Sequence, residues 1–220
     1  MQTQHKTKTV FITGGTGYIG VRLIRQLRGR GHKVIALVRK NSEHKLPAGT
    51  DYVVGDPFDA ATFVQHIPPG STFIQLLGVP HPGPKKRDLF YQIDLSSAKT
   101  SADAATTAGV AHFIYVSVVQ EPSGIMRDYQ QVRAEAEQYI LSKKLNCTFI
   151  RPWYVLGPGH RWPVLLFPLY AILKLHPRTR RKAEVFGLVK LSQMLKALVA
   201  TVEEPGNFSS VLEVGDIRKF

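Results

Sequence analysis

The chain has 220 residues, of which 44% are hydrophobic and 20% are charged, so it is long enough to bury one substantial core. Its single cysteine, Cys147, excludes an internal disulfide and lies in an apolar segment, which indicates a packing role and fits a reducing compartment. The net charge of +13 is compatible with an anionic ligand or surface, but no pattern typical of specific nucleic-acid recognition accompanies it.

The first eight residues are polar and show no signal peptide, so we expect a cytoplasmic protein. The longest apolar stretch covers residues 162–173, contains two prolines and falls short of the roughly 18 residues that span a bilayer. This stretch and the basic run at 178–182 could rest on an anionic membrane as a peripheral contact. The alternative is a core helix followed by a solvated basic turn.

The first predicted element is a β-strand at residues 9–13, where β-branched and aromatic side chains follow one another. A glycine-rich turn comes next, with Gly14, Gly17 and Gly20 in the spacing G-x-x-G-x-x-G, and a helical pattern follows it. Such a turn lets the backbone approach an oxygen atom closely, and the helix N-terminus favours an anion. The sequence therefore predicts a dinucleotide-binding turn, for which the alternative is a loop that only reverses the chain.

Apolar runs and helical patterns alternate through the rest of the chain. This alternation predicts an α/β fold, a Rossmann-type doubly wound parallel sheet with helices on both faces. We expect a single domain over residues 1–220, with a small C-terminal lobe contributed by about 153–205. The expected strands are 33–38, 52–54, 72–77, 111–117, 146–151 and 210–214; the expected helices are 59–66, 85–109, 128–144, 163–175 and 187–202, with a loop at 153–161.

The residue that follows the second expected strand is Arg39. In a sheet of this kind the ligand lies beyond the carboxyl ends of the strands, and an acid at this position would accept hydrogen bonds from the ribose hydroxyls of NAD. A guanidinium suits a 2′-phosphate instead, so the sequence favours NADP(H) over NAD(H). The alternative is an exposed basic turn.

Three polar residues lie at or after the end of the fifth expected strand, namely Ser117, Tyr129 and Arg133. Positions 129 and 133 share one face of a helix. A fixed cation favours the phenolate and so lowers the pKa of a neighbouring tyrosine, which can then exchange a proton with a carbonyl or an alcohol. We take these three as candidate catalytic residues; the alternative is a helix with a surface tyrosine and arginine. We single out no set of metal ligands.

Five motifs stand out in the chain, namely Thr13-Gly14-Gly15-Thr16-Gly17-Tyr18-Ile19-Gly20, Gly55-Asp56, Tyr115-Val116-Ser117, Tyr129-x-x-x-Arg133 and Arg151-Pro152-x-x-x-x-Gly157. Together they resemble the short-chain dehydrogenase/reductase superfamily, and within it the atypical and extended branch of NAD(P)-binding proteins similar to NmrA and to nucleotide-sugar epimerases. The resemblance covers about residues 9–202. The glycine motif and the Arg-Pro motif are specific to this branch, and the others support it.

The resemblance implies a role for each matching residue. Active members of the family carry a lysine where this chain has Arg133, and that lysine bridges the ribose hydroxyls and lowers the pKa of the tyrosine. Arginine is larger and is not an equivalent replacement. The implied contacts are the pyrophosphate for Gly14, Thr16, Gly17, Tyr18 and Ile19, the 2′-phosphate for Arg39, the adenine for Asp56, the ribose for Gly78, the nicotinamide for Pro152 and Tyr154, and the proton relay for Ser117 and Tyr129.

These observations lead us to expect an NADP(H)-dependent oxidoreductase that acts on a small or lipophilic carbonyl substrate. Because Arg133 replaces the lysine, the first alternative is a non-catalytic NADPH sensor or assembly protein, and a weaker one is an epimerase or isomerase. Aromatic residues of the C-terminal lobe are available as an apolar pocket wall. They are Trp153, Tyr154, Trp162, Phe167 and Tyr170.

Overall fold

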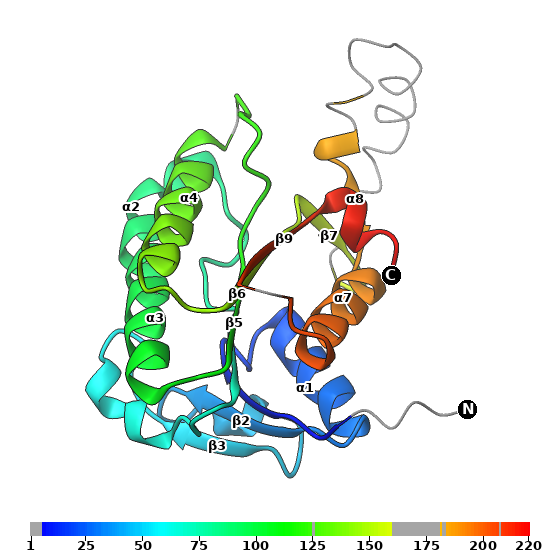
Figure 1. Ribbon diagram of the computed structural model, residues 1–220. Coiled ribbons are helices and arrows are strands. Elements are labelled where there is room, and N and C mark those ends of the chain that lie inside the picture. Colours follow the sequence, from blue (N-terminus) through cyan, green and yellow to red (C-terminus); the bar gives the residue numbers. More distant parts are fainter. Residues whose placement is uncertain (1–5, 125, 160–180, 182–183, 207) are drawn as a thin grey trace.

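The computed structural model describes residues 6–124, 126–159, 181, 184–206 and 208–220. Within these residues, seven parallel strands form one sheet in the order β3-β2-β1-β4-β5-β6-β9 (Figure 1). The chain builds outward from β1 to β3 and then returns to place β4 on the other side of β1. The strands are β1 (Thr9–Thr13), β2 (Lys33–Val38), β3 (Asp51–Val54), β4 (Thr72–Gln75), β5 (His112–Val116), β6 (Cys147–Arg151) and β9 (Ser209–Glu213).

Helices cover both faces of this sheet. Helices α3 and α4 lie on one face, and α1 and α7 lie on the other (Figure 1). The predicted Rossmann-type α/β fold is therefore confirmed. The helices are α1 (Tyr18–Gly29), α2 (Arg87–Leu89), α3 (Ser96–Ala108), α4 (Arg127–Ser142), α7 (Leu191–Glu203) and α8 (Val214–Ile217).

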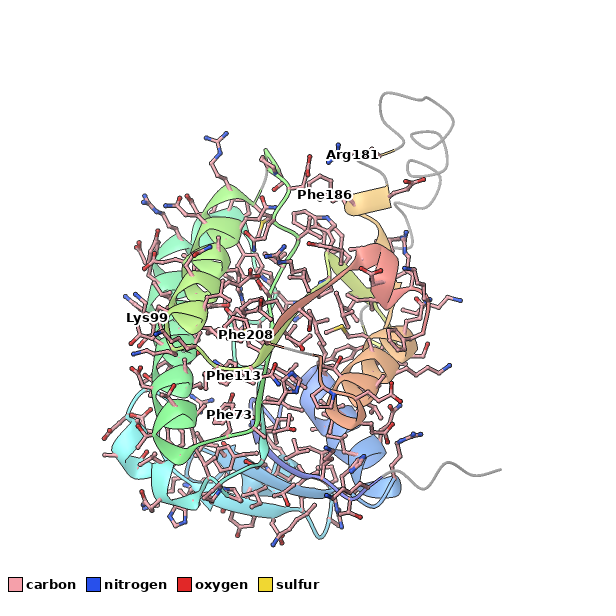
Figure 2. The ribbon with its side chains drawn as sticks, viewed as in Figure 1. Phe73, Lys99, Phe113, Arg181, Phe186 and Phe208 are labelled. Carbon is pink, nitrogen blue, oxygen red and sulfur yellow. The ribbon has the colours of Figure 1, made fainter. Side chains whose placement is uncertain are left out.

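Alternate residues of each strand supply the two halves of the core, as the period of two in a β-strand requires. In β1, Val10 and Ile12 pack toward α1 and α7, whereas Phe11 packs on the opposite side with the residues of α3 and α4. Phe73 of β4 and Phe113 of β5 continue the row begun by Phe11, with ring centroids 5.3 Å and 5.2 Å apart between successive members (Figure 2). This row of buried phenylalanines holds the three central strands in register.

Two predicted helices differ from the structure in their winding. Residues 59–66 form two short 3₁₀ turns, Ala60–Thr62 and Val64–His66, rather than one α-helix. Asp59 caps the first of them, because its carboxylate accepts a hydrogen bond of 3.0 Å from the Ala61 N–H. The predicted helix 85–109 contains a π-helical segment, Phe90–Leu95, directly before α3. Insertions of this kind occur often at functional sites.

Two predictions for the C-terminal third are wrong. The expected loop 153–161 contains a strand, β7 (Tyr154–Leu156), and the expected helix 187–202 starts with another, β8 (Leu188–Lys190). The two strands pair in parallel as a separate small sheet, and α7 begins only at Leu191. The apolar spacing of residues 188–202 fits a helix throughout. The strand β8 is therefore revealed only by its pairing with β7, which is distant in the sequence. The apolar segment 163–175 and the basic run lie outside the described residues, apart from Arg181.

Strand β6 is joined to its neighbours by the arginine of the Arg-Pro motif. The Arg151 guanidinium contacts Glu137 of α4 at 3.0 Å and Glu213 of β9 at 2.8 Å. Cys147, at the other end of β6, is buried, and burial raises the pKa of its thiol to about 11. A thiol with a raised pKa is a poor nucleophile, in agreement with the packing role predicted for it.

A buried polar row crosses the amino ends of β5, β6 and β9. His112 Nε2 lies 2.9 Å from the Thr148 hydroxyl, which lies 2.8 Å from the Ser210 hydroxyl. The side chain of His112 is only 1% exposed, and its Nδ1 has no hydrogen-bond partner among the described residues. Burial, with a smaller effect of the positive charge of Lys8, lowers the pKa of His112 to about 4.

We predict that this histidine makes the protein less stable in acid. Below pH about 6.5 the unfolded chain binds a proton that the folded protein binds only near pH 4, so stability falls as the pH drops through this interval. Between pH 7 and 4.5 the loss amounts to about 2.5 kcal/mol. Urea unfolding at the two pH values should show a smaller loss in His112→Gln than in the wild type, whereas His66→Gln, at an exposed position, should behave as the wild type. Equal losses in wild type and His112→Gln would contradict this assignment.

Candidate functional site

The glycine-rich turn joins the end of β1 to the start of α1. Gly14 has a φ of 70°, in the left-handed region, and its carbonyl accepts a hydrogen bond of 3.0 Å from the Gly17 N–H. Gly17 is the N-cap of α1 and, having no side chain, cannot cap it. The first-turn N–H groups of a helix have no partner within the helix, so this N-terminus is suited to bind an anion.

The turn is also too closely packed for larger residues. A Cβ atom on Gly14 would lie 2.8 Å from the backbone of Leu76 and Leu77, just beyond β4. A Cβ atom on Gly20, in the first turn of α1, would overlap the Gly14 carbonyl. The turn therefore lies directly against the end of β4, at the point where the strand order reverses, which is where doubly wound sheets bind their ligands.

A small cavity of about 50 Å³ lies on the β2 side of the turn. Arg39 and Ser42 line it together with Gly14 and Thr16 of the turn. Asp56 does not line it, and its carboxylate instead accepts a hydrogen bond of 2.9 Å from the Phe58 N–H. The structure thus brings the predicted 2′-phosphate residue and two predicted pyrophosphate residues to one cavity and leaves the predicted adenine residue beside it. The other lining residues are Thr13, Leu37, Val38, Pro57 and Leu77.

A larger cavity of about 250 Å³ lies on the other side of the turn, at the ends of β4, β5 and β6. Most of its lining is apolar, and among the described residues its charged or hydroxyl-bearing side chains are those of Ser117, Tyr129 and Arg133, the three candidate catalytic residues. Three predicted cofactor residues, Ile19, Gly78 and Pro152, line it as well, and the other lining residues are Leu76, Val79, Pro82, Val116, Val118, Trp153 and Val155.

Two further predicted cofactor residues, Tyr154 and Tyr18, line neither cavity. Trp153 and Val155 line the larger cavity in place of Tyr154, because alternate residues at the start of β7 face opposite ways. Tyr18 packs under the guanidinium of Arg22, which lies 4.3 Å from the centre of its ring. The Tyr18 hydroxyl lies against the backbone of Gly157, where a Cβ atom would overlap it. Tyr18 therefore joins the glycine turn to the small β7–β8 sheet.

The hydroxyl of Ser117 is a buried polar group in the lining of this cavity that lacks a hydrogen-bond partner in the described part of the chain. Ser117 is 4% exposed, and its Oγ makes no hydrogen bond within the described residues. Its backbone N–H donates to the Ile150 carbonyl at 2.8 Å, which fixes the residue at the end of β5. A buried hydroxyl without a partner is costly, so a ligand that accepts or donates a hydrogen bond here would be bound favourably.

Arg133 is engaged by groups that the sequence motif did not reveal. Its Nη1 donates to the Tyr115 hydroxyl at 3.0 Å and to the Val116 carbonyl at 2.9 Å, and its Nη2 donates to the Asp94 carboxylate. The other oxygen of Asp94 accepts a hydrogen bond of 3.1 Å from the Val79 N–H. Asp94 is fully buried in the π-helical segment. The available signal was an acid placed directly between two apolar residues, Ile93 and Leu95.

The pKa of Tyr129 changes in the direction opposite to the one expected. Burial raises it above its usual value, and although the charge of Arg133 lowers it, Asp94 raises it again. The Arg133 guanidinium lies 5.1 Å from the centre of the Tyr129 ring. Tyr129 is thus a neutral phenol at neutral pH, and the prediction of a tyrosine with a lowered pKa is wrong.

The residues present fit a dinucleotide in two respects. The glycine turn leaves no room for side chains between the two cavities, and Ser117 offers a buried hydroxyl that lacks a partner.

In the described part of the chain, no helix combines the length and apolar character needed to cross a membrane.

Comparisons with known proteins agree with this arrangement. Residues 14–160 match the family model described as NAD(P)H-binding. A ceramide reductase of Caulobacter vibrioides is 27% identical over 216 residues, which are 96% of this chain and 65% of that protein. A chloroplastic divinyl chlorophyllide a 8-vinyl-reductase of Oryza sativa subsp. indica is 30% identical over 142 residues, 59% of this chain and 34% of that protein. The chain thus spans between about a third and two thirds of the length of these relatives.

Solved structures share the fold at low sequence identity. MoeE5 in complex with UDP-glucuronic acid and NAD has a TM-score of 0.70 and 21% identity, over 94% of this chain and 76% of that one. WbmH of Bordetella bronchiseptica in complex with NAD⁺ has a TM-score of 0.69 and 19% identity, over 93% and 75% of the two chains. The family match, together with these likenesses, confirms the resemblance inferred from the motifs and supports nicotinamide-dinucleotide binding. The chain therefore belongs to the NAD(P)H-binding family, as an atypical member of the short-chain dehydrogenase/reductase superfamily.

Proposed function

We propose that the protein is an NADPH-dependent reductase of a lipophilic carbonyl compound. The observation that carries this proposal is the placement of the unpartnered Ser117 hydroxyl and the Tyr129 phenol on the wall of one mainly apolar cavity. A cavity with apolar walls and a few converging polar groups is the usual form of a small-molecule site.

The glycine turn and the two cavities would together hold the cofactor. The diphosphate would lie at the N-terminus of α1, the adenosine end in the cavity of Arg39 and Ser42, and the nicotinamide end beside Gly78 and Pro152. A bound reduced nicotinamide supplies a hydride to a carbonyl carbon. The residues of this chain orient the carbonyl and provide the proton.

Tyr129 would donate that proton to the carbonyl oxygen. Because burial raises its pKa, Tyr129 carries its proton at neutral pH, as a general acid in a reduction must. The Ser117 hydroxyl would donate a hydrogen bond to the same oxygen and thereby stabilise the negative charge that develops there. The resemblance to the family assigns the same two residues to the proton relay.

The preference for NADPH rests on the cavity of Arg39 and Ser42. These two residues contribute a guanidinium and a hydroxyl to the lining, and no carboxylate of the described residues lines this cavity. A guanidinium suits a 2′-phosphate, whereas a carboxylate there would suit the ribose hydroxyls of NAD.

The apolar lining supports a lipophilic substrate. Relatives of this chain carry names that refer to ceramide, to divinyl chlorophyllide and to a 3-β-hydroxysteroid, all of which are molecules with large apolar parts. We therefore propose a ketone attached to an apolar body as the substrate class.

A second function is favoured by one specific observation. Arg133 is held by Asp94, Tyr115 and Val116, and so it is less free to act than a lysine at the end of a flexible chain. A protein that binds NADPH without turnover, and whose bound state is recognised by a partner, would tolerate this arrangement.

Replacing Arg39 should change the cofactor preference. In Arg39→Gln the loss of a charge-assisted contact with the 2′-phosphate should weaken NADPH binding by about 10- to 100-fold, with little effect on NADH. Lys40→Gln is the matched control, because Lys40 is the adjacent cation and does not line the cavity. Calorimetric titration of each variant with both nucleotides measures the effect, and a wild type that binds NADH as tightly as NADPH would refute the preference.

Replacing the proton donor should remove turnover while leaving the cofactor bound. Tyr129→Phe should reduce NADPH oxidation with ketone derivatives of ceramides or steroids by about 10²- to 10⁴-fold. Tyr139→Phe is the matched control, since Tyr139 lies on the same helix and its hydroxyl contacts Asp103 on α3 instead of the cavity. Tyr129→Phe with wild-type turnover would exclude it as the acid, and a wild type that binds NADPH yet oxidises it with no ketone, quinone or flavin would favour the sensor.

A further inference from the structure

The buried residue Asp94 contacts the candidate site from an element that the motifs do not include. It belongs to the π-helical segment Phe90–Leu95, which packs along α4. Two residues of the segment, four positions apart, face two residues of α4 with the same separation. The Phe90 ring lies 4.9 Å from the Tyr129 ring, and the Asp94 carboxylate forms an ion pair with Arg133.

The ion pair is buried between α4, β5, the π-helical segment and the loop after β4. The side chains of Asp94 and Arg133 are 0% and 7% exposed. The Tyr115 hydroxyl and the Val116 carbonyl hold the guanidinium from β5, and the Val79 N–H holds the carboxylate from the loop after β4. Gly78 covers the pair on the side of the large cavity, because a Cβ atom there would overlap the guanidinium and lie 2.8 Å from Asp94 Oδ1.

We propose that Asp94 is a positioning residue that fixes Arg133 beneath Gly78 and offsets its charge, so that Tyr129 acts as the proton donor in the proposed reduction. This inference rests on the proposed function for its catalytic consequence, but its electrostatic part concerns groups that are all described in the structure. An arginine without this partner would present a full positive charge to the phenol at about 5 Å and would favour the phenolate.

The charged and titratable groups around Tyr129 are arranged so that the charge of Asp94 offsets that of Arg133. Arg133 faces it from its own helix, Asp94 faces it from the π-helical segment, and Tyr115 lies on β5 behind the guanidinium. Outside this buried group, Arg87 and Asp128 form an exposed ion pair with an N–O distance of 3.9 Å, and their charges also offset each other. Removing the Asp94 charge therefore leaves Arg133 as an unbalanced buried cation beside Tyr129.

The direct test is the titration of the Tyr129 phenol, followed by NMR with ¹³Cζ-labelled tyrosine. The signal is assigned by its absence in Tyr129→Phe. In Asp94→Asn the Tyr129 signal should titrate at a pH at least about one unit lower than in the wild type. Asp103→Asn is the matched control, because it removes a carboxylate of α3 that contacts Tyr139 and Lys143 outside the site. In this variant the Tyr129 phenol should titrate as it does in the wild type.

A variant with both charges removed separates electrostatics from packing. In Asp94→Asn with Arg133→Gln the shift toward lower pH should disappear, because the cation that favours the phenolate is gone. If Asp94→Asn does not fold, Arg133→Gln is compared with this double variant. Because Arg133→Gln keeps the Asp94 charge, the pKa of Tyr129 should be about one unit higher in Arg133→Gln than in the double variant. Thermal melting at the same pH values shows which variants are folded.

The outcomes distinguish this inference from the proposed function. Identical Tyr129 titration in the wild type, Asp94→Asn and Asp103→Asn would overturn the role of Asp94, whatever the protein catalyses. A wild type that neither binds NADPH nor reduces a ketone would refute the proposed function and leave the titration comparison valid. If the protein turns over, the alkaline limb of its kcat profile should also move to lower pH by about one unit in Asp94→Asn.

Discussion

The turn between β1 and α1 lies against backbone on two sides, and neither side leaves room for a Cβ atom. Gly14 contacts the chain just beyond β4, and Gly20 contacts the Gly14 carbonyl. This close approach fixes the N-terminus of α1 at the point where the sheet changes direction, between the two cavities of the site. The anion-binding character of the helix end depends on this contact, and so do the cofactor path and the carbonyl position that we propose.

The second determinant is a buried ion pair rather than a motif. A lysine in place of Arg133 would carry one flexible ammonium, whereas the planar guanidinium reaches Asp94, Tyr115 and Val116 at the same time. With arginine at this position, the cation has a structural role, because the Arg133 guanidinium joins β5, α4 and the π-helical segment. Tyr129 then depends on burial for its protonation state more than on a neighbouring cation.

Local patterns predicted the fold, and they predicted which candidate residues would gather at one edge of the sheet, because both follow from short-range spacing. The β-branched and aromatic run around Phe11 identifies the first strand, and the glycine turn that follows it marks the carboxyl edge where Arg39 and Ser117 also lie. The features that were missed depend on pairing between distant residues. The β7–β8 pairing joins residues over thirty positions apart, and the Asp94–Arg133 contact joins residues separated by 39 positions. No periodicity within one segment records such contacts.

The most direct measurement of the central claim is a calorimetric titration of the wild-type protein with the oxidised and reduced forms of NAD and NADP, together with its melting temperature in each nucleotide. The account predicts heat of binding and a raised melting temperature, largest with NADPH. Absence of both heat and thermal protection with all four nucleotides would contradict the assignment of the glycine turn as a dinucleotide-binding site.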